Sequence, residues 1–310
     1  MSIRGRLVSF AIRLALKPML KRDDLSIEAL RARLATTDQM SEPIPKGFTS
    51  DVCELGGVPC RSIAPEALNT RRTLVYFHGG GYVLPGSAGH AQLAAHLGLA
   101  GQCRVILVDY RLAPEHPFPA AVEDAMAVFQ ALHEQGLPSH QLMIGGDSAG
   151  GGLAAATLLN LKLQGLPQPA AAVLLSPWLD LALTGGSMQS NADRDVMLGE
   201  AVLARWAATY LGERDPLAPL ASPLFGDCAN LAPVLVHVGD SEVLLADAEQ
   251  YVDHIIEAGG SAALKVFKNV PHVFQVLIGR LPEAKTSLDL IGQYIDEQFE
   301  ACERAANSPE

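Results

Sequence analysis

The stretch that decides the fold reads LMIGGDSAGGGLAAATLLN and runs from Leu142 to Asn160. It begins with an apolar run, passes through a cluster of glycines, and continues with small and apolar residues over a length typical of a helix. The pattern therefore predicts a buried strand, a sharp turn and a helix in direct succession.

The turn between this strand and this helix carries a candidate nucleophile. Residues 146–150 read GDSAG and fit the pattern GxSxG, whose glycines remove the Cβ atoms that would clash when a serine occupies a strained turn. Ser148 would lie at the helix N-terminus, where unpaired N–H groups favour developing negative charge. A glycine-rich turn can also cradle a phosphate, but the GxGxxG spacing and the P-loop lysine are missing here. We therefore expect nucleophilic chemistry at Ser148.

Short apolar runs alternate with helix-length segments on both sides of this stretch. The expected strands are residues 73–77, 105–108, 142–144, 172–175, 234–238 and 264–267, and the expected helices are residues 88–100, 119–135, 148–164 and 244–258. Strands that read as continuous apolar runs between helices indicate a mostly parallel sheet covered on both faces, so the fold class is α/β. Residues 180–230 exceed the length of one crossover helix, so we expect an insertion there, with a helix over residues 195–211.

The N-terminal segment is amphipathic and basic. Apolar residues recur at helical spacing over residues 3–20, and the first 22 residues carry six basic and no acidic side chains. We expect this helix to pack on the body of the protein, and attachment to an anionic membrane surface is an open alternative. A second helical pattern covers residues 27–34. The sequence SEPIPKG at residues 41–47 then marks a boundary, because its prolines and glycine break helices.

The composition is that of a globular protein. Of 310 residues, 49% are apolar and 18% are charged, which excludes a disordered chain. The formal net charge of −11 disfavours general binding to nucleic-acid phosphates. Five cysteines are scattered without a CxxC pair, so we expect neither a disulfide framework nor a metal site. No apolar run is long enough to span a membrane, and Arg13 stops the apolar stretch that a signal peptide would need, so we expect a soluble cytoplasmic protein.

A second glycine cluster, HGGGY, begins at His78 directly after a predicted strand. Its three glycines leave main-chain N–H groups unhindered and able to bind a substrate oxygen. Together with the N–H of Ala149 they are candidates for an oxyanion hole. We favour Gly80 and Gly81 as donors and keep Gly79 as an alternative. His78 precedes the nucleophile on a different strand, so we expect it to orient this loop rather than to act as a base.

Three motifs lie in a fixed order along the chain. They are HGGGY from His78, DYRLAPEHPFPAAVED over residues 109–124, and GDSAGG from Gly146. In sequence and order they resemble the hormone-sensitive-lipase branch, also called family IV, of the α/β-hydrolase superfamily of esterases. With the acid and histidine segments described below, the resemblance extends over roughly residues 70–275.

The resemblance implies an α/β-hydrolase fold with about eight strands in the central sheet, a helical cap, and serine hydrolase activity on esters without a cofactor. It assigns residues 1–45 to an N-terminal cap segment and residues 46–310 to the hydrolase core, with residues 183–215 as a cap insertion. It also implies that two copies of the chain associate into a homodimer.

A serine hydroxyl needs a base within hydrogen-bond reach to accept its proton. In this fold the residues follow in the chain order serine, acid, histidine, which leaves His237, His254 and His272 as candidates. His237 interrupts an apolar strand and His254 lies on a predicted helix, so we expect structural roles for both. His272 lies in the sequence NVPHVF just after a predicted strand, where a catalytic loop residue belongs, and we predict that it is the base.

The acid of the site is expected after the strand at residues 234–238, where the sequence GDSEVLL offers Asp240 and Glu242. Most relatives carry Asp-Pro-Leu at this place. Aligning that leucine with Leu244 puts Glu242 at the catalytic position, which resembles family branches that use glutamate. We therefore favour Glu242 and keep Asp240 as the alternative. Either carboxylate would hold the tautomer of His272 and stabilise its imidazolium.

Substrate contacts are expected from Tyr82, Trp178, Leu179 and Trp206. The predicted function is a serine carboxylesterase that hydrolyses short- to medium-chain carboxylic esters through an acyl-enzyme. Two alternatives stay open, which are a lipase or lipid deacylase at a membrane surface and a non-catalytic small-molecule receptor. The expected partner is a small-molecule ester.

Overall fold

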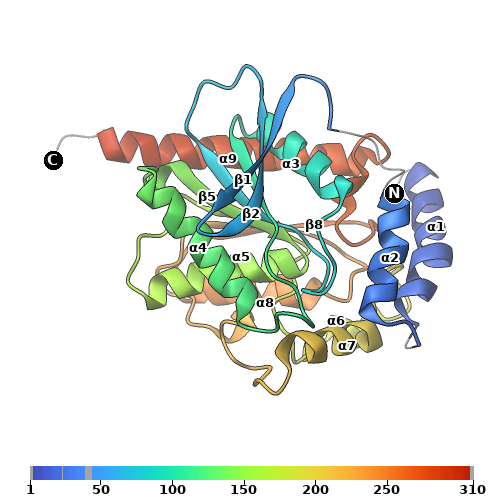
Figure 1. Cartoon of the computed structure of the whole chain (residues 1–310). Coiled ribbons are helices and arrows are strands. Elements are labelled where there is room, and N and C mark those ends of the chain that lie inside the picture. The colour runs from blue at the N-terminus through green and yellow to red at the C-terminus, as the bar shows by residue number, and fades with distance from the viewer. Residues whose placement is uncertain (1–2, 23, 39–43, 308–310) are drawn as a thin grey trace.

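The structure is a computed structural model that describes residues 3–22, 24–38 and 44–307. These described residues form an eight-stranded sheet of order β1-β2-β4-β3-β5-β6-β7-β8, flanked by helices (Figure 1). The strands are β1 (Phe48–Leu55), β2 (Val58–Pro65), β3 (Thr73–Phe77), β4 (Arg104–Val108), β5 (Leu142–Asp147), β6 (Ala172–Leu175), β7 (Val234–Gly239) and β8 (Ala262–Phe267). The predicted α/β class and the eight-stranded sheet are confirmed.

Helices cover both faces of this sheet. The α-helices are α1 (Ile3–Leu20), α2 (Ile27–Asp38), α3 (Ala88–Ala100), α4 (Ala120–Glu134), α5 (Ala149–Leu163), α6 (Ser187–Ser190), α7 (Glu200–Leu211), α8 (Leu245–Glu257) and α9 (Pro282–Asn307). Figure 1 shows α3 and α9 on one side of the sheet and α4, α5 and α8 on the other. Along β3, Leu74 and Tyr76 join the core under α3 and α9, whereas Val75 and Phe77 join the core on the opposite face. This alternation follows from the two-residue repeat of a strand.

Strands β3 to β8 run parallel, and this orientation positions the site. Every residue of β3, β5, β6 and β7 is buried, which is why these strands read as continuous apolar runs. Because parallel strands end at the same edge of a sheet, the segments that follow β3, β5, β6, β7 and β8 meet there.

The edge of the sheet contains the elements that the apolar pattern missed. Strands β1 and β2 pair antiparallel, and most of β1 is exposed, so its sequence lacks a strong strand signal. They are joined at Gly56 and Gly57, whose φ angles of +59° and +80° suit a tight hairpin turn.

The C-terminal helix α9 was not predicted either. Strand β8 closes the opposite edge, and homodimerisation through such an edge stays a prediction.

The insertion between β6 and β7 contains α6 and α7, but the helix expected from residue 195 begins at Glu200. The carboxylate of Asp195 accepts the N–H groups of Met197 and Leu198, which fixes this segment as a turn. Gly199 then has an extended backbone before the helix starts. The predicted start was therefore five residues too early.

The N-terminal helix α1 lies beside this insertion, as Figure 1 also shows. Lys17 Nζ donates to the carbonyl of Ala192 at 3.3 Å and to the carbonyl of Asp195. From α7, Arg205 donates to the carbonyl of Leu20 at 3.0 Å. None of the described helices is long and apolar enough to cross a membrane.

Helix α2 is fixed to the loop that follows β3. Arg31 donates to the carbonyls of Val83 and Ala113, each at 2.7 Å, and pairs with Glu115 at 2.6 Å. The N-terminal segment thus contacts both the insertion and the HGGGY loop. The division of the chain into cap and core at residues 45 and 46 stays a prediction, and residues 39–43 beside that boundary lie outside the described part of the chain.

Candidate active site

Ser148 lies at the turn between β5 and α5, in a strained conformation. Its φ of 53° and ψ of −121° fall in a region of backbone angles that residues other than glycine rarely adopt. The chain crosses closely here, since a Cβ on Gly146 would lie 2.3 Å from the carbonyl oxygen of Gly150. A Cβ on Gly150 would lie 2.0 Å from the carbonyl oxygen of Phe77. Both flanking positions therefore require glycine, as the GxSxG pattern predicted.

We expect Gly150→Ala to lower the free energy of unfolding by at least about 2 kcal/mol, because the added methyl group must displace the backbone of β3. The matched control is Gly186→Ala. Gly186 has a φ of −61° and no atom within 4 Å of an added Cβ, so its unfolding free energy should change by less than about 0.5 kcal/mol. Urea unfolding measures both, and equal midpoints for the two variants would contradict the packing argument.

The HGGGY loop follows β3 and lies against this turn. The N–H of Gly79 donates to Asp147 Oδ2 at 3.0 Å, so this donor is engaged within the protein. Gly80 and Gly81 have φ angles of +124° and +63°, which favour glycine. Ala149 is the first residue of α5, where helix N–H groups lack partners within the helix. The hydrogen bond of Gly79 favours Gly80 and Gly81 over Gly79 as oxyanion donors, and these assignments stay predictions.

Two further predicted residues meet at the carboxyl edge of the sheet. Glu242 follows β7 and His272 follows β8, and His272 Nδ1 lies 2.6 Å from Glu242 Oε2. Both side chains are almost fully buried. The other carboxylate oxygen, Oε1, accepts the N–H of Gly239 at 2.5 Å and the hydroxyl of Ser176 at 2.8 Å. The carboxylate is therefore held by three hydrogen bonds in a fixed orientation.

Burial and the Glu242 carboxylate shift the pKa of His272 in opposite directions. Burial by itself lowers the pKa of His272, because a buried imidazolium loses its hydration, whereas the hydrogen bond and the charge of Glu242 raise it. The effect of Glu242 prevails, so the pKa of His272 lies above its ordinary value. Burial likewise raises the pKa of Glu242, and the hydrogen bond from His272 opposes that shift.

Asp240, the alternative acid, makes different contacts. Its Oδ1 accepts the N–H of Asn269 at 2.7 Å, and its Oδ2 lies 3.5 Å from the guanidinium of Arg194. The contact with His272 is made by Glu242. These positions favour Glu242 over Asp240 as the acid of the site.

The insertion holds the loop that carries Glu242. Asn191 Nδ2 donates to the carbonyl of Glu242 at 2.8 Å, and Asp195 Oδ2 accepts the N–H of Val243 at 2.9 Å. Sequence reasoning did not single out Asn191 or Asp195, because their partners lie in a distant segment of the chain.

Ser176 is a third residue that sequence reasoning missed. Its hydroxyl donates to Glu242, and the same oxygen accepts the N–H of Val273, the neighbour of His272, at 3.3 Å. Ser176 thus links the acid to the histidine loop. The available signal was its place directly after β6, where a polar residue at the carboxyl end of a buried parallel strand can reach the site. Ser176 and Val273 also have φ angles of 46° and 48°, so strained residues gather around this site.

Of the four predicted substrate contacts, Tyr82 is the last residue of the HGGGY loop and Trp206 lies beside that loop. Trp206 of α7 packs against Gly81, where a Cβ would lie 2.2 Å from the indole ring. Tyr82 stacks on Tyr210 of α7 with ring centroids 3.9 Å apart. The insertion therefore supplies aromatic side chains next to the proposed oxyanion donors.

Trp178 and Leu179 are fully buried in the core. The indole N–H of Trp178 donates to the carbonyl of Asp180 at 2.9 Å, and the N–H of Leu179 donates to Asp247 at 2.9 Å. These contacts are internal to the protein, and roles of Trp178 and Leu179 in substrate binding stay predictions.

The other histidines considered make structural contacts. His78 stacks on Tyr110 with ring centroids 4.4 Å apart, and burial lowers the pKa of His78 to about 4. His237 Nδ1 lies 2.8 Å from the hydroxyl of Ser287, and burial lowers its pKa to about 4. His254 Nδ1 lies 3.2 Å from a main-chain carbonyl.

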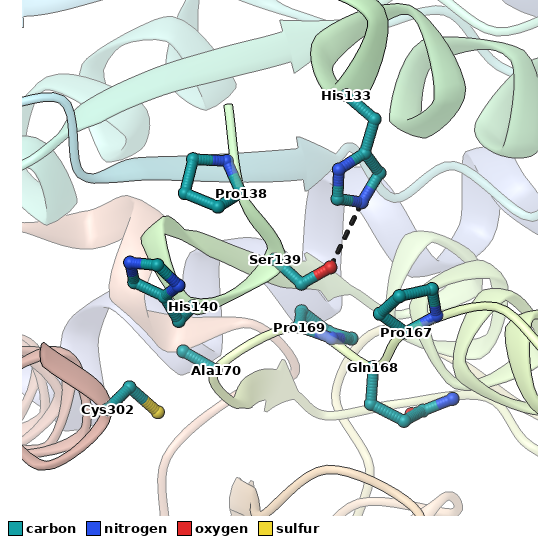
Figure 2. Close-up of a pocket in the computed structure, with 9 residues that line it drawn as sticks. All are labelled: His133, Pro138, Ser139, His140, Pro167, Gln168, Pro169, Ala170 and Cys302. Carbon is teal, nitrogen blue, oxygen red and sulfur yellow. Dashed lines mark hydrogen bonds between the residues drawn. The ribbon is translucent and has the colours of Figure 1, made fainter. Parts of the chain in front are cut away.

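A surface cavity of about 480 Å³ lies away from these residues (Figure 2). It is lined by His133, Pro138, Ser139, His140, Pro167, Gln168, Pro169, Ala170 and Cys302. Residues 138–140 precede β5 and residues 167–170 precede β6, so the cavity lies at the amino edge of the sheet, opposite Ser148. Ser139 Oγ lies 3.0 Å from His133 Nε2. Within the described part of the chain, no group of three or more His, Cys, Asp or Glu side chains is placed to bind a metal ion.

Comparisons with known proteins agree with the observed fold. A family profile described as alpha/beta hydrolase fold matches residues 74–276. An acetyl-hydrolase of Streptomyces hygroscopicus is 40% identical over 252 residues, which cover 81% of this chain and 83% of that protein. The carboxylesterase/phospholipase LipF of Mycobacterium tuberculosis is 31% identical over 95% of this chain and 82% of its own length. The crystal structure of an esterase from the bacterial hormone-sensitive lipase family superimposes with a TM-score of 0.91 at 37% identity, covering 96% of this chain and 99% of the other.

Proposed function

The chain belongs to the α/β-hydrolase family and is a hormone-sensitive-lipase-like carboxylic ester hydrolase, and from this premise we propose that Ser148, His272 and Glu242 form its catalytic triad. The observation that carries the proposal is the buried 2.6 Å hydrogen bond between His272 Nδ1 and Glu242 Oε2. This bond assigns the histidine proton to Nδ1 and leaves Nε2 as the nitrogen that can accept a proton from Ser148.

In the acylation step, Ser148 Oγ attacks the carbonyl carbon of the ester while its proton passes to His272 Nε2. The carbonyl oxygen takes up the negative charge and accepts hydrogen bonds from the N–H groups of Gly80, Gly81 and Ala149. When the tetrahedral intermediate collapses, the bond to the alcohol oxygen breaks. His272 returns the proton to that oxygen, and the alcohol leaves an acyl group on Ser148.

In the deacylation step, water takes the place of the alcohol. His272 Nε2 accepts a proton from the water as its oxygen attacks the acyl carbon, and the same N–H groups hold the oxyanion. Collapse releases the carboxylic acid and returns the proton to Ser148 Oγ. Glu242 stays ionised throughout and stabilises the imidazolium of His272.

We propose short- to medium-chain acyl groups as the preferred substrates. Helix α7 packs close to the proposed oxyanion donors through the aromatic rings of Trp206 and Tyr210, and Tyr210 stacks on Tyr82. This close packing supports a binding site for short acyl chains. On p-nitrophenyl esters from acetate to palmitate, we expect the highest kcat/KM between acetate and octanoate and a loss of at least about ten-fold at palmitate. A maximum at palmitate would contradict this preference while leaving the triad untouched.

A second candidate function is hydrolysis of lipid esters at a membrane surface. It is favoured by exposed apolar residues of α1 and by the similarity to LipF, which is named a carboxylesterase/phospholipase. The discriminating measurement is hydrolysis of long-chain ester emulsions by the full chain and by a variant without residues 1–22. Activity that is high on emulsions and lost in the truncated variant would support the second candidate.

A further inference from the structure

One face of α1 carries apolar side chains that the fold does not bury. Leu7, Phe10 and Leu14 are 65%, 61% and 62% exposed. Their spacing of three and four residues puts them on one side of the helix, and the exposed Ala11 lies between them. Single exposed apolar side chains are ordinary on a protein surface, but a continuous row on one helix face is typical of a contact surface.

The opposite face of α1 is committed to the body of the protein. Val8 packs against an apolar cluster that includes Phe267, Val270 and Phe274. Leu16 packs against the core to which Val75 and Phe77 belong. Lys17 is buried and donates to the insertion, as described above. The exposed row is therefore the outer side of a helix whose inner side is already packed.

The charge around this row favours one kind of partner. The first 22 residues carry six basic and no acidic side chains, whereas the whole chain has a formal net charge of −11. Arg13 is exposed next to Leu14 on α1, and Lys21 is exposed just beyond the helix. A second copy of the chain would bring the same positive segment against this one, whereas a surface of negative charge with an apolar interior complements both features.

We propose that the row formed by Leu7, Phe10 and Leu14 docks this protein on the surface of an anionic lipid bilayer. The three side chains enter the boundary between headgroups and acyl chains, and the exposed side chains of Arg13 and Lys21 lie among the lipid phosphates. Val8 of α1 packs against an apolar cluster that includes Val270 and Phe274, which flank His272 in sequence, so docking turns the side of the molecule that carries the histidine loop toward the membrane. The proposal concerns binding and does not rest on the triad.

The test is flotation of the full chain with vesicles made of ether-linked lipids, which contain no ester bond to hydrolyse. We expect the protein to float with phosphatidylglycerol vesicles at low salt, and to float weakly with phosphatidylcholine vesicles or at high salt. The triple variant Leu7→Ser, Phe10→Ser, Leu14→Ser should lower the partition coefficient by at least about 100-fold. Arg13→Gln should lower it by about five-fold.

The matched control replaces three exposed apolar residues elsewhere, with Val52→Ser, Leu163→Ser and Ile256→Ser, whose side chains are 80%, 64% and 53% exposed. This control should float like the wild type. An equal loss in the control, or no flotation of the wild type with anionic vesicles, would overturn the proposal. A lipid-free dimer in light scattering that the α1 triple variant dissociates would also overturn it, because the row would then be an interface between copies.

Discussion

Replacing Ser148 with alanine should lower kcat for p-nitrophenyl butyrate by about 10⁴- to 10⁶-fold and leave the fold intact. Without the hydroxyl there is no acyl-enzyme, and only binding and the oxyanion donors remain to accelerate attack by water. Alanine accepts the strained backbone of residue 148 about as poorly as serine does, so the unfolding midpoint in urea should stay close to that of the wild type. Steady-state kinetics and urea unfolding together separate lost chemistry from lost structure.

Ser139 provides a matched control within the same chain. Its hydroxyl lies 3.0 Å from a nitrogen of His133, at the edge of the sheet opposite to Ser148. Ser139→Ala should keep near wild-type kcat, and a fluorophosphonate probe should label the wild type and Ser139→Ala but not Ser148→Ala. Turnover by Ser148→Ala above about one per cent of wild type would show that the nucleophile lies elsewhere.

The strands that the apolar pattern predicted most directly are those that are buried along their whole length. Strands β3, β5, β6 and β7 are apolar throughout, so hydrophobic patterning found them to within three residues at their ends. The β1–β2 hairpin was missed because its exposed edge carries polar residues, and its strand conformation depends on pairing rather than on burial. Only the resemblance to a known family indicated the full sheet.

The residues of the candidate site likewise divide into those that the sequence predicted and those that it did not. Ser148 and its glycines were predictable, because the steric demands of the turn act between neighbours in sequence. Asp240 and Glu242 could not be separated by spacing alone, since both follow β7, and only the resemblance favoured the glutamate. Ser176 carried only the signal of its place directly after β6, because its role arises from contacts with the Glu242 carboxylate and with the loop that follows β8.

Replacing Glu242 with glutamine should lower the plateau kcat/KM by about 10³- to 10⁴-fold, the second-largest effect expected here. The hydrogen bonds explain why. Oε1 of Glu242 accepts a main-chain N–H from Gly239, which can only donate, so a glutamine must place its carbonyl oxygen there. Its NH₂ group then faces His272 Nδ1 and donates to it. The proton of the neutral imidazole moves to Nε2, and His272 can no longer accept the proton of Ser148.

Glu242→Gln should also change the pH dependence of kcat/KM, in a direction fixed by the loss of the carboxylate charge. His272 acts as a base only when neutral, so activity falls as pH drops through its pKa, which the Glu242 carboxylate raises above the ordinary value of about 6.5. Without that carboxylate, burial is left to lower the pKa, so the acidic limb of kcat/KM should move to lower pH. Asp240→Asn is the control, because Asp240 contacts Asn269 and Arg194 instead, and both its plateau and its limb should match the wild type. If Asp240→Asn moved the limb and Glu242→Gln did not, the acid would be Asp240. The direction of the shift thus tests which carboxylate acts on the histidine, independently of any loss of activity from a disturbed fold.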